Sequence, residues 1–280
     1  MIDLHTHTTA SDGRCAPAEL VLRASAAGVT VLSVTDHDTV AAAAAASATC
    51  AETGVEFVPG IEITAVSRDT DVHVLGYFLG VESPSLQTFL AAQRLRRIDR
   101  LREIVARLAL FDIHLDADAL AQPAIDDPST SAGRPWIARA LVAAGHVAST
   151  GVAFEKWLSR GRPAFVPRLA ASPEEVVGLI HNAGGLASLA HPGLLRHDEW
   201  IPTFVNAGLD ALEAFHTDHD ADTRDRYVQL ARRYGVLVSG GSDYHGDASH
   251  GAPAPGTTSL PRDAYERLIA KGRLRTTTSG

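Results

Sequence analysis

The chain opens with Met1-Ile2-Asp3-Leu4-His5-Thr6-His7, a short apolar run that ends in two histidines two positions apart. Side chains alternate in direction along an extended strand, so His5 and His7 point the same way from the end of this strand. Imidazole nitrogens that converge on one point are common metal ligands. The stretch therefore predicts a first strand that brings two ligands to a metal site.

The residues that follow predict a repeated unit, in which a helix and a glycine precede an apolar run that ends in polar residues. Pro17 suits the first turn of a helix that ends near Gly28, and the apolar run at residues 29–34 comes next. Asp38 follows this run and is placed to cap the alanine-rich helix that extends toward Gly54.

Further apolar runs of strand length lie at residues 55–63, 72–78, 186–190, 209–215 and 236–239. A capping box at Ser172-Pro173-Glu174-Glu175 predicts the start of the helix that precedes the third of these runs. The alternation of helices with apolar strands predicts a parallel sheet covered by helices. Such sheets and barrels build their active sites at the C-terminal ends of the strands.

Between about residues 83 and 167 this alternation stops. Helices are predicted at residues 93–110, 135–144 and 152–159. We therefore expect an α/β domain built from residues 1–84 and 165–280, and a helical insertion at residues 85–164 that recognises the substrate. Three arginines of the first helix, Arg94, Arg97 and Arg100, are expected on an exposed face.

Composition limits the class of protein. The chain has 280 residues, of which 45% are hydrophobic, and no apolar run is long enough to predict a membrane span. The strand at Ile2 leaves no room for a signal segment before it, so a cytoplasmic protein is expected. Cys15 and Cys50 belong to no CxxC pair and are expected to be free thiols. The formal charge of −8 argues against binding to extended duplex nucleic acid, but it does not argue against an anionic substrate.

Polar residues with metal-ligating side chains follow or interrupt the apolar runs. They are His5, His7, Asp12, Asp36, His37, Glu62, His73, His191, Asp243 and His245. Imidazole nitrogen and carboxylate oxygen without thiolate favour Mn, Zn or Fe over Ca or Mg. One such residue is usually an ordinary buried hydrogen-bonding group, but a set of this size at one end of successive strands predicts a metal centre.

The combination of HTH near the N-terminus, TDHD, an isolated Glu, an isolated His, AHP and SDYH resembles the polymerase and histidinol phosphatase (PHP) family. The resemblance implies an α/β fold, a distorted (β/α)7 barrel with a mostly helical insertion. It also implies two or three divalent metal ions, with Mn favoured, and hydrolysis of a phosphate ester by a metal-bridging hydroxide.

The resemblance also implies which residues bind the ions. One ion is held by His5, His7, Glu62 and Asp243. Glu62 bridges to a second ion, which His73 and His191 also bind, while Asp12, His37 and His245 bind a third. Asp36 is expected to orient a ligand histidine rather than to bind metal. His216 ends the run at residues 209–215 and is the predicted proton donor to the leaving oxygen, beside the catalytic Glu62 and Asp243.

Two arginine-containing stretches bear on the substrate. Arg134 directly precedes a predicted helix start at Pro135, and a guanidinium at a helix N-terminus suits a phosphate. Arg160 and Arg162 lie where the chain returns to the barrel. Both stretches resemble the insertion of a PHP subgroup that acts on nucleoside 3′,5′-bisphosphates and short oligonucleotides, so these arginines and His216 are the predicted substrate-binding residues.

Two other functions remain open: a small-molecule phosphatase of the histidinol-phosphatase type, and a module associated with a polymerase. Three aromatic residues, Trp136, Trp157 and Phe165, either stack a base or pack inside the insertion. The remaining histidines are expected at the surface: His114, His146, His181, His197, His219 and His250. The sequence makes no prediction of oligomeric state.

Overall fold

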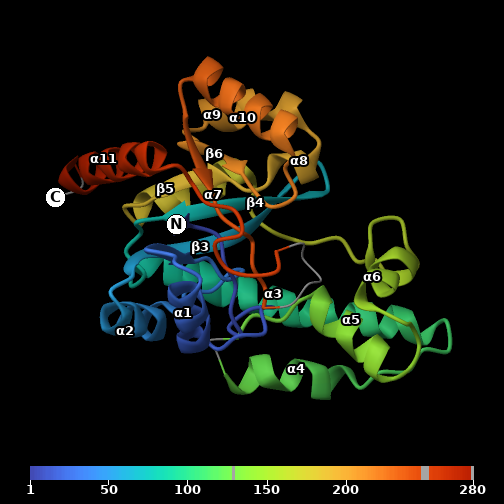
Figure 1. Ribbon diagram of the computed structural model, residues 1–280. Helices are drawn as coiled ribbons and strands as arrows, with labels where there is room; N and C mark the ends of the chain where they lie inside the picture. The colour runs from blue at the N-terminus through green and yellow to red at the C-terminus, as the bar shows by residue number, and fades with distance from the viewer. Residues whose placement is uncertain (128–129, 247–251, 279–280) are drawn as a thin grey trace.

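Seven strands form one sheet that closes almost completely into a barrel (Figure 1). The computed structural model describes residues 1–127, 130–246 and 252–278. The strands lie side by side in chain order: β1 (Ile2–Asp3), β2 (Val31–Val34), β3 (Glu56–Ser67), β4 (Thr70–Tyr77), β5 (Leu186–Leu189), β6 (Ala211–Phe215) and β7 (Leu237–Gly240). The Leu4 N–H donates to the Gly240 carbonyl at 3.2 Å, so the first and last strands are also neighbours.

The sheet is mixed, which corrects the expectation of a parallel sheet. β4 runs antiparallel to both of its neighbours, whereas the other pairs are parallel. Only Arg68 and Asp69 separate β3 from β4, and both have positive φ angles, 48° and 62°. A connection of this length makes a hairpin, because a parallel crossover needs about a dozen residues or more. The beginning of β4 therefore lies at the edge where β3 and β5 end.

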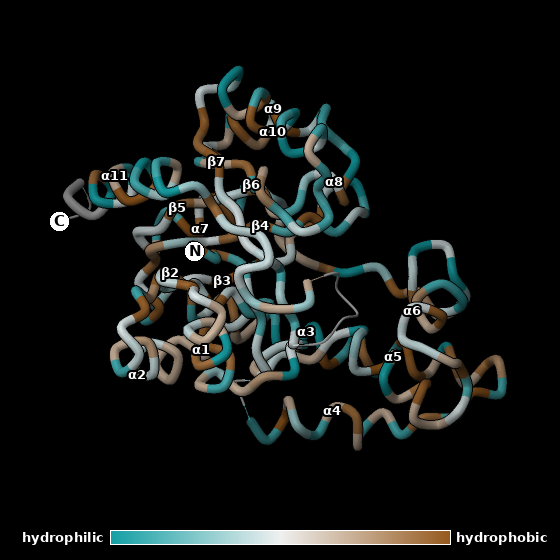
Figure 2. The backbone as a smooth tube through the Cα atoms, in the orientation of Figure 1, coloured by the Kyte–Doolittle hydropathy of each residue, from teal (hydrophilic) through white to brown (hydrophobic). Residues whose placement is uncertain are grey.

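Helices cover the outside of the barrel (Figure 1). They are α1 (Pro17–Ala26), α2 (Ala43–Thr53), α7 (Pro173–Asn182), α8 (Pro192–Leu195), α9 (Ile201–Asn206), α10 (Ala221–Tyr234) and α11 (Arg262–Thr278), with a 3-10 turn, η2, at Asp198–Trp200. The predicted capping box is confirmed, because the side chains of Ser172 and Glu175 each accept the other's backbone N–H. Hydrophobic and hydrophilic residues alternate along these helices (Figure 2), as expected for helices packed on one side.

The predicted cap of α2 is wrong. The N-cap residue of this helix is Ala42, which makes no side-chain capping hydrogen bond. Asp38 instead turns its fully buried carboxylate toward Arg97 and the backbone N–H of Thr64. The Arg97 guanidinium and the Asp38 carboxylate are both charged, so the hydrogen bonds between them are stronger than a helix-capping bond from an uncharged backbone N–H.

The segment between β4 and β5 carries the predicted helical insertion, at the lower right of Figure 1. Its helices are α3 (Pro84–Ala109), α4 (Ala117–Asp126), α5 (Arg134–Ala143) and α6 (Thr150–Ala153), followed by a π-helical turn, η1 (Phe154–Leu158). The sequence patterns had not indicated α4. Leu101, Leu108, Ile137 and Leu141 belong to a hydrophobic cluster that is separate from the clusters around the barrel strands.

Candidate metal centre

One edge of the barrel brings together all nine predicted metal ligands. His5 and His7 follow β1, Asp12 lies in the next loop, His37 follows β2, Glu62 is in β3, His73 is in β4, His191 follows β5, and Asp243 and His245 follow β7. Two of them lie within a strand. Glu62 lies within β3, and His73 lies near the start of β4, which reaches this edge because β4 runs antiparallel.

Glu62 lies at the middle of the cluster. Its Oε2 is 3.4, 3.3 and 3.0 Å from ring nitrogens of His5, His7 and His37. Its Oε1 is 2.8 Å from His73 and 3.2 Å from His191. Burial alone would raise the pKa of this carboxyl, but the surrounding imidazoles outweigh burial and hold the pKa well below its usual range. Glu62 is therefore an anion with one oxygen directed to each of two groups of histidines.

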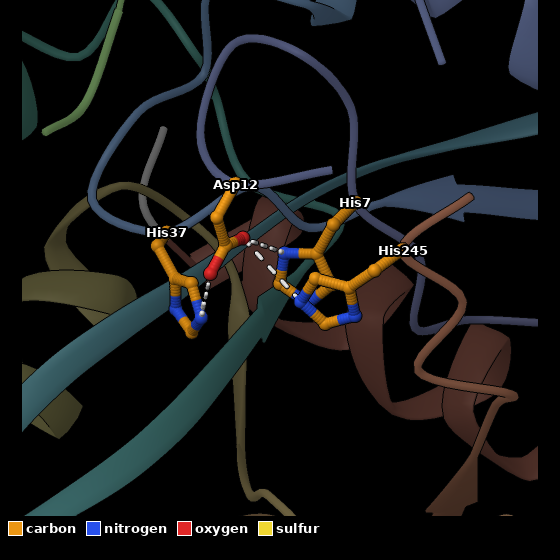
Figure 3. A group of neighbouring side chains, drawn as sticks. All are labelled: His7, Asp12, His37 and His245. Atoms are coloured by element: carbon orange, nitrogen blue, oxygen red, sulfur yellow. Dashed lines mark ion pairs between the residues drawn. The ribbon is translucent and has the colours of Figure 1, made fainter. Parts of the chain in front are cut away.

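A second group surrounds Asp12 (Figure 3). His245 Nε2 lies 3.3 Å from Asp12 Oδ1, and His37 Nε2 lies 3.7 Å from Oδ2. The rings of His7 and His245 stack with centroids 4.1 Å apart. Burial and the neighbouring His245 lower the pKa of His7 to about 3, so His7 is a neutral donor of electron pairs. For His245, burial opposes the charge, but Asp12 and Asp243 raise its pKa to about 9.

The buried atoms of the cluster fit bound cations. Among the described residues, His5 Nε2, both ring nitrogens of His7, His37 Nδ1 and Glu62 Oε2 are buried without a hydrogen-bond partner. Buried polar atoms are normally satisfied, since an unpaired one costs about 1–3 kcal/mol. Lone pairs on nitrogen and carboxylate oxygen that face one another are satisfied by a metal ion placed between them.

Glu213 holds two of these histidines in place, and sequence reasoning missed it. Its Oε1 lies 2.9 Å from His5 Nδ1, and its Oε2 accepts the backbone N–H of His191 at 2.7 Å. A carboxylate that is hydrogen-bonded to one ring nitrogen of a histidine orients the ring, so that the other nitrogen can bind a metal. An acid between apolar residues, in the run at residues 209–215, was the available signal.

Asp36 does not orient a histidine, contrary to the expectation. Its carboxylate accepts the backbone N–H and the hydroxyl of Thr8 at 2.7 and 2.6 Å, and the hydroxyl of Ser11 at 2.6 Å. Asp36 therefore shapes the loop that carries Asp12. It acts on the cluster through the backbone rather than through an imidazole.

His216 lies beside the cluster but is only 2% exposed. Its Nδ1 accepts the Asp218 N–H at 3.1 Å, which leaves the proton of the neutral ring on Nε2, 3.4 Å from Asp243 Oδ2. Burial would lower the pKa of His216, but the hydrogen bond to Asp243 and the charge of Glu213 raise it. The ring thus presents an N–H donor to the cluster.

Of the six histidines expected at the surface, one is buried and a second is only partly exposed. His219 is 9% exposed and hydrogen-bonds on both sides of its ring. His181 pairs with the buried carboxylate of Asp210 at 2.8 Å. His250 lies outside the described residues.

A cavity of about 250 Å³ opens onto the cluster, and three arginines line it together with ligand side chains. Arg134 pairs with Asp71 at 3.1 Å, and Arg97 and Arg168 both pair with Asp38, at 2.6 and 3.3 Å. The expectation that Arg97 is exposed is wrong, because only 8% of it is accessible. Arg168 was not predicted at all.

Arg160 and Arg162 do not line this cavity. Both are exposed, and Arg160 hydrogen-bonds to the carbonyl of Asp69 and the hydroxyl of Thr70 in the β3–β4 turn. Of the predicted substrate-binding arginines, Arg134 is the one that faces the metal cluster.

Comparison with known proteins identifies the family. A family model described as PHP domain matches residues 3–150. The chain belongs to the PHP family. It is 34% identical, over 96% of its length and 97% of the relative's, to a 3′,5′-nucleoside bisphosphate phosphatase of Chromobacterium violaceum. It is 36% identical to the 5′-3′ exoribonuclease Rnm of Salmonella typhimurium, over 87% of this chain and 84% of that one.

A solved structure has the same PHP architecture. An amidohydrolase from Chromobacterium violaceum, determined with bound sulfate and no metal, superposes with a TM-score of 0.86 at 32% identity, covering 96% of each chain. The protein is thus a PHP-type phosphoric ester hydrolase with a His, Asp and Glu cluster able to bind metal ions. Within the described residues, no helix is long and apolar enough to cross a membrane.

Proposed function

We propose that this PHP protein removes the 3′-phosphate from nucleoside 3′,5′-bisphosphates and degrades short oligonucleotides from their 5′ ends. The observation that carries the proposal is the shared cavity, in which Arg97, Arg134 and Arg168 face the metal cluster. A nucleoside bisphosphate has two phosphates, so the metals can bind the one that reacts while the arginines bind the other. The names of the two relatives support the same substrates.

The proposed cofactor is a set of two or three divalent ions, with Mn preferred. His5, His7, Glu62 and Asp243 would hold one ion, Glu62, His73 and His191 a second, and Asp12, His37 and His245 a third. When bound, such ions activate water and neutralise the reacting phosphate. Glu62 suits the bridging position because its two oxygens face different histidines.

The proposed role of the arginines is to grip the phosphate that does not react. Arg97, Arg134 and Arg168 share two carboxylates, Asp38 and Asp71, so one positive charge is left for a ligand. Arg134 has Asp71 on one side, while its guanidinium also lines the cavity. Guanidinium–phosphate contacts are charge-assisted and often bidentate, and they suit a terminal 5′-phosphate.

His216 is proposed as the proton donor to the leaving oxygen. The neighbouring carboxylates Asp243 and Glu213 raise the pKa of His216 and so favour the imidazolium, which is the form that can give up a proton and become a neutral ring. The ring Nε2 also approaches Asp243, so a role in positioning that carboxylate is the competing explanation.

A substrate panel tests the function. With Mn²⁺ present, phosphate release is measured on adenosine 3′,5′-bisphosphate and on histidinol phosphate, and release of nucleoside monophosphate is measured on a 5′-phosphorylated short oligoribonucleotide. We expect the highest kcat/KM on the bisphosphate and measurable cleavage of the oligonucleotide. A preference for histidinol phosphate would contradict the proposal and favour the small-molecule phosphatase.

A further inference from the structure

The metal cavity has apolar walls that phosphate chemistry does not require. Most of its lining is charged or imidazole-bearing, and Phe154 and Leu194 are the largest apolar side chains among the described lining residues. Binding pockets commonly use apolar walls to hold the uncharged part of a ligand. These two residues therefore point to a part of the substrate that has an apolar face.

Leu194 lies on α8, three residues after the predicted ligand His191, and is 49% exposed. The next residue, Leu195, packs against the hydrophobic cluster of the barrel. The short helix thus directs one leucine to the core and leaves its neighbour at the cavity. The exposed half of the Leu194 side chain becomes buried only when a ligand covers it, and that burial favours binding.

His219 fixes the position of this leucine. Its Nδ1–H donates to the Ala214 carbonyl at 3.0 Å, and its Nε2 accepts the Gly193 N–H at 3.1 Å. The contact leaves no space for a side chain at residue 193, because a Cβ there would lie 2.7 Å from His219 Nε2. A buried histidine thereby ties the turn before Leu194 to the end of β6.

Phe154 reaches the cavity from the insertion. It begins the π-helical turn η1, a rare geometry that occurs frequently at functional sites. The guanidinium of Arg134 lies 5.8 Å from the centre of its ring. The aromatic ring is therefore next to the arginine that is proposed to hold the 5′-phosphate.

The three aromatic residues considered from the sequence make other contacts. Trp136 donates its indole N–H to the Ser11 carbonyl at 3.3 Å, and Trp157 packs on Phe111 with ring centres 5.5 Å apart. Phe165 lies under the guanidinium of Arg100. None of the three lines the metal cavity among the residues described.

We propose that Phe154 and Leu194 form a nucleobase clamp, with Phe154 on the side of the insertion and Leu194 on the side of the barrel. The clamp rests on the proposed nucleotide substrate and adds a binding site for the base. Every nucleobase has a flat apolar face, so stacking and apolar contact hold bases without selecting among them. Such a clamp suits an enzyme that removes successive nucleotides.

The test compares substrates with and without a base. Phe154→Ala and Leu194→Ala should each lower kcat/KM on adenosine 3′,5′-bisphosphate by about tenfold, within the range for loss of one stacking contact. On the abasic analogue 1,2-dideoxyribose 3,5-bisphosphate, the same variants should match the wild type. Leu110→Ala, at a leucine that is 80% exposed outside the cavity, is the matched control and should change neither value.

A binding measurement separates this proposal from the proposed function. Adenosine 5′-monophosphate should bind the metal-loaded wild type more tightly than ribose 5-phosphate, and both clamp variants should lose that difference. If the wild type hydrolyses no bisphosphate, the proposed function fails, while the binding comparison still decides the clamp. Equal affinity of the wild type for the two ligands, or equal losses on the base-bearing and abasic substrates, would overturn the clamp.

Discussion

Arg97 of α3 and Asp38 of the loop after β2 form a buried ion pair, with Nε and Nη2 of the arginine 2.7 and 2.6 Å from one carboxylate oxygen. The pair joins the inserted helix to the loop that carries His37. Arg97 also donates to the Ala132 carbonyl at 2.9 Å, close to the start of α5. One side chain thus connects the barrel, the insertion and the metal cavity.

Replacing Arg97 should weaken both the fold and the site. Breaking a buried pair from one side typically costs about 3–5 kcal/mol. Asp38 keeps Arg168 and the Thr64 N–H as partners, so we expect Arg97→Leu to lower the free energy of unfolding by about 3 kcal/mol. Urea unfolding followed by circular dichroism measures the loss.

The control for this variant is Arg102→Leu. Arg102 and Asp118 make an ion pair of 3.1 Å whose side chains are 44% and 80% exposed, and such pairs contribute less than about 1 kcal/mol. Equal destabilisation by the two variants would show that the Arg97 pair has no special structural role.

The role of Arg134 is tested by removing the phosphate that it is proposed to hold. A charge-assisted contact is worth about 1.5–3 kcal/mol, so Arg134→Ala should lower kcat/KM on a 3′,5′-bisphosphate by about ten- to a hundredfold. On a 3′-monophosphate the variant should behave like the wild type. A wild type that does not distinguish the two substrates would contradict the assignment.

Metal content gives an independent test of the cluster. Protein purified without chelator should contain two or three transition-metal ions per chain by elemental analysis, and Mn²⁺ should restore activity after chelation. Glu62→Gln removes the proposed bridging carboxylate, so it should lose metal and nearly all activity. Full metal content and full activity in Glu62→Gln would refute the bridging role.

The proton-donor role of His216 predicts a dependence on the leaving group. His216→Asn should lower kcat for a nucleoside phosphate by about 10²–10⁴-fold, the range for general acid catalysis. An aryl phosphate with a good leaving group needs little protonation and should be affected much less. Equal losses on both substrates would mean that the hydrogen bond to Asp243 is what matters, and that His216 is a positioning residue.

Local sequence determined much of this protein. His5 and His7 were predicted to point together because side chains two positions apart lie on the same side of an extended backbone. The Ser172 capping box and the start of α1 at Pro17 are local in the same sense. The alternation of helices and apolar runs was sufficient to predict a helix-covered sheet with polar ligands at one edge, and the resemblance to the PHP family implied the barrel.

Only the tertiary structure decided which side chains meet in the cavity. The three-residue spacing of Arg94, Arg97 and Arg100 resembles a solvated helix face, but Arg97 is buried because Asp38, 59 positions away, supplies its partner. Phe154 and Leu194 likewise come from segments that share no local pattern. The burial and charge of a side chain depend on what packs against it, and residues distant in the chain supply those partners.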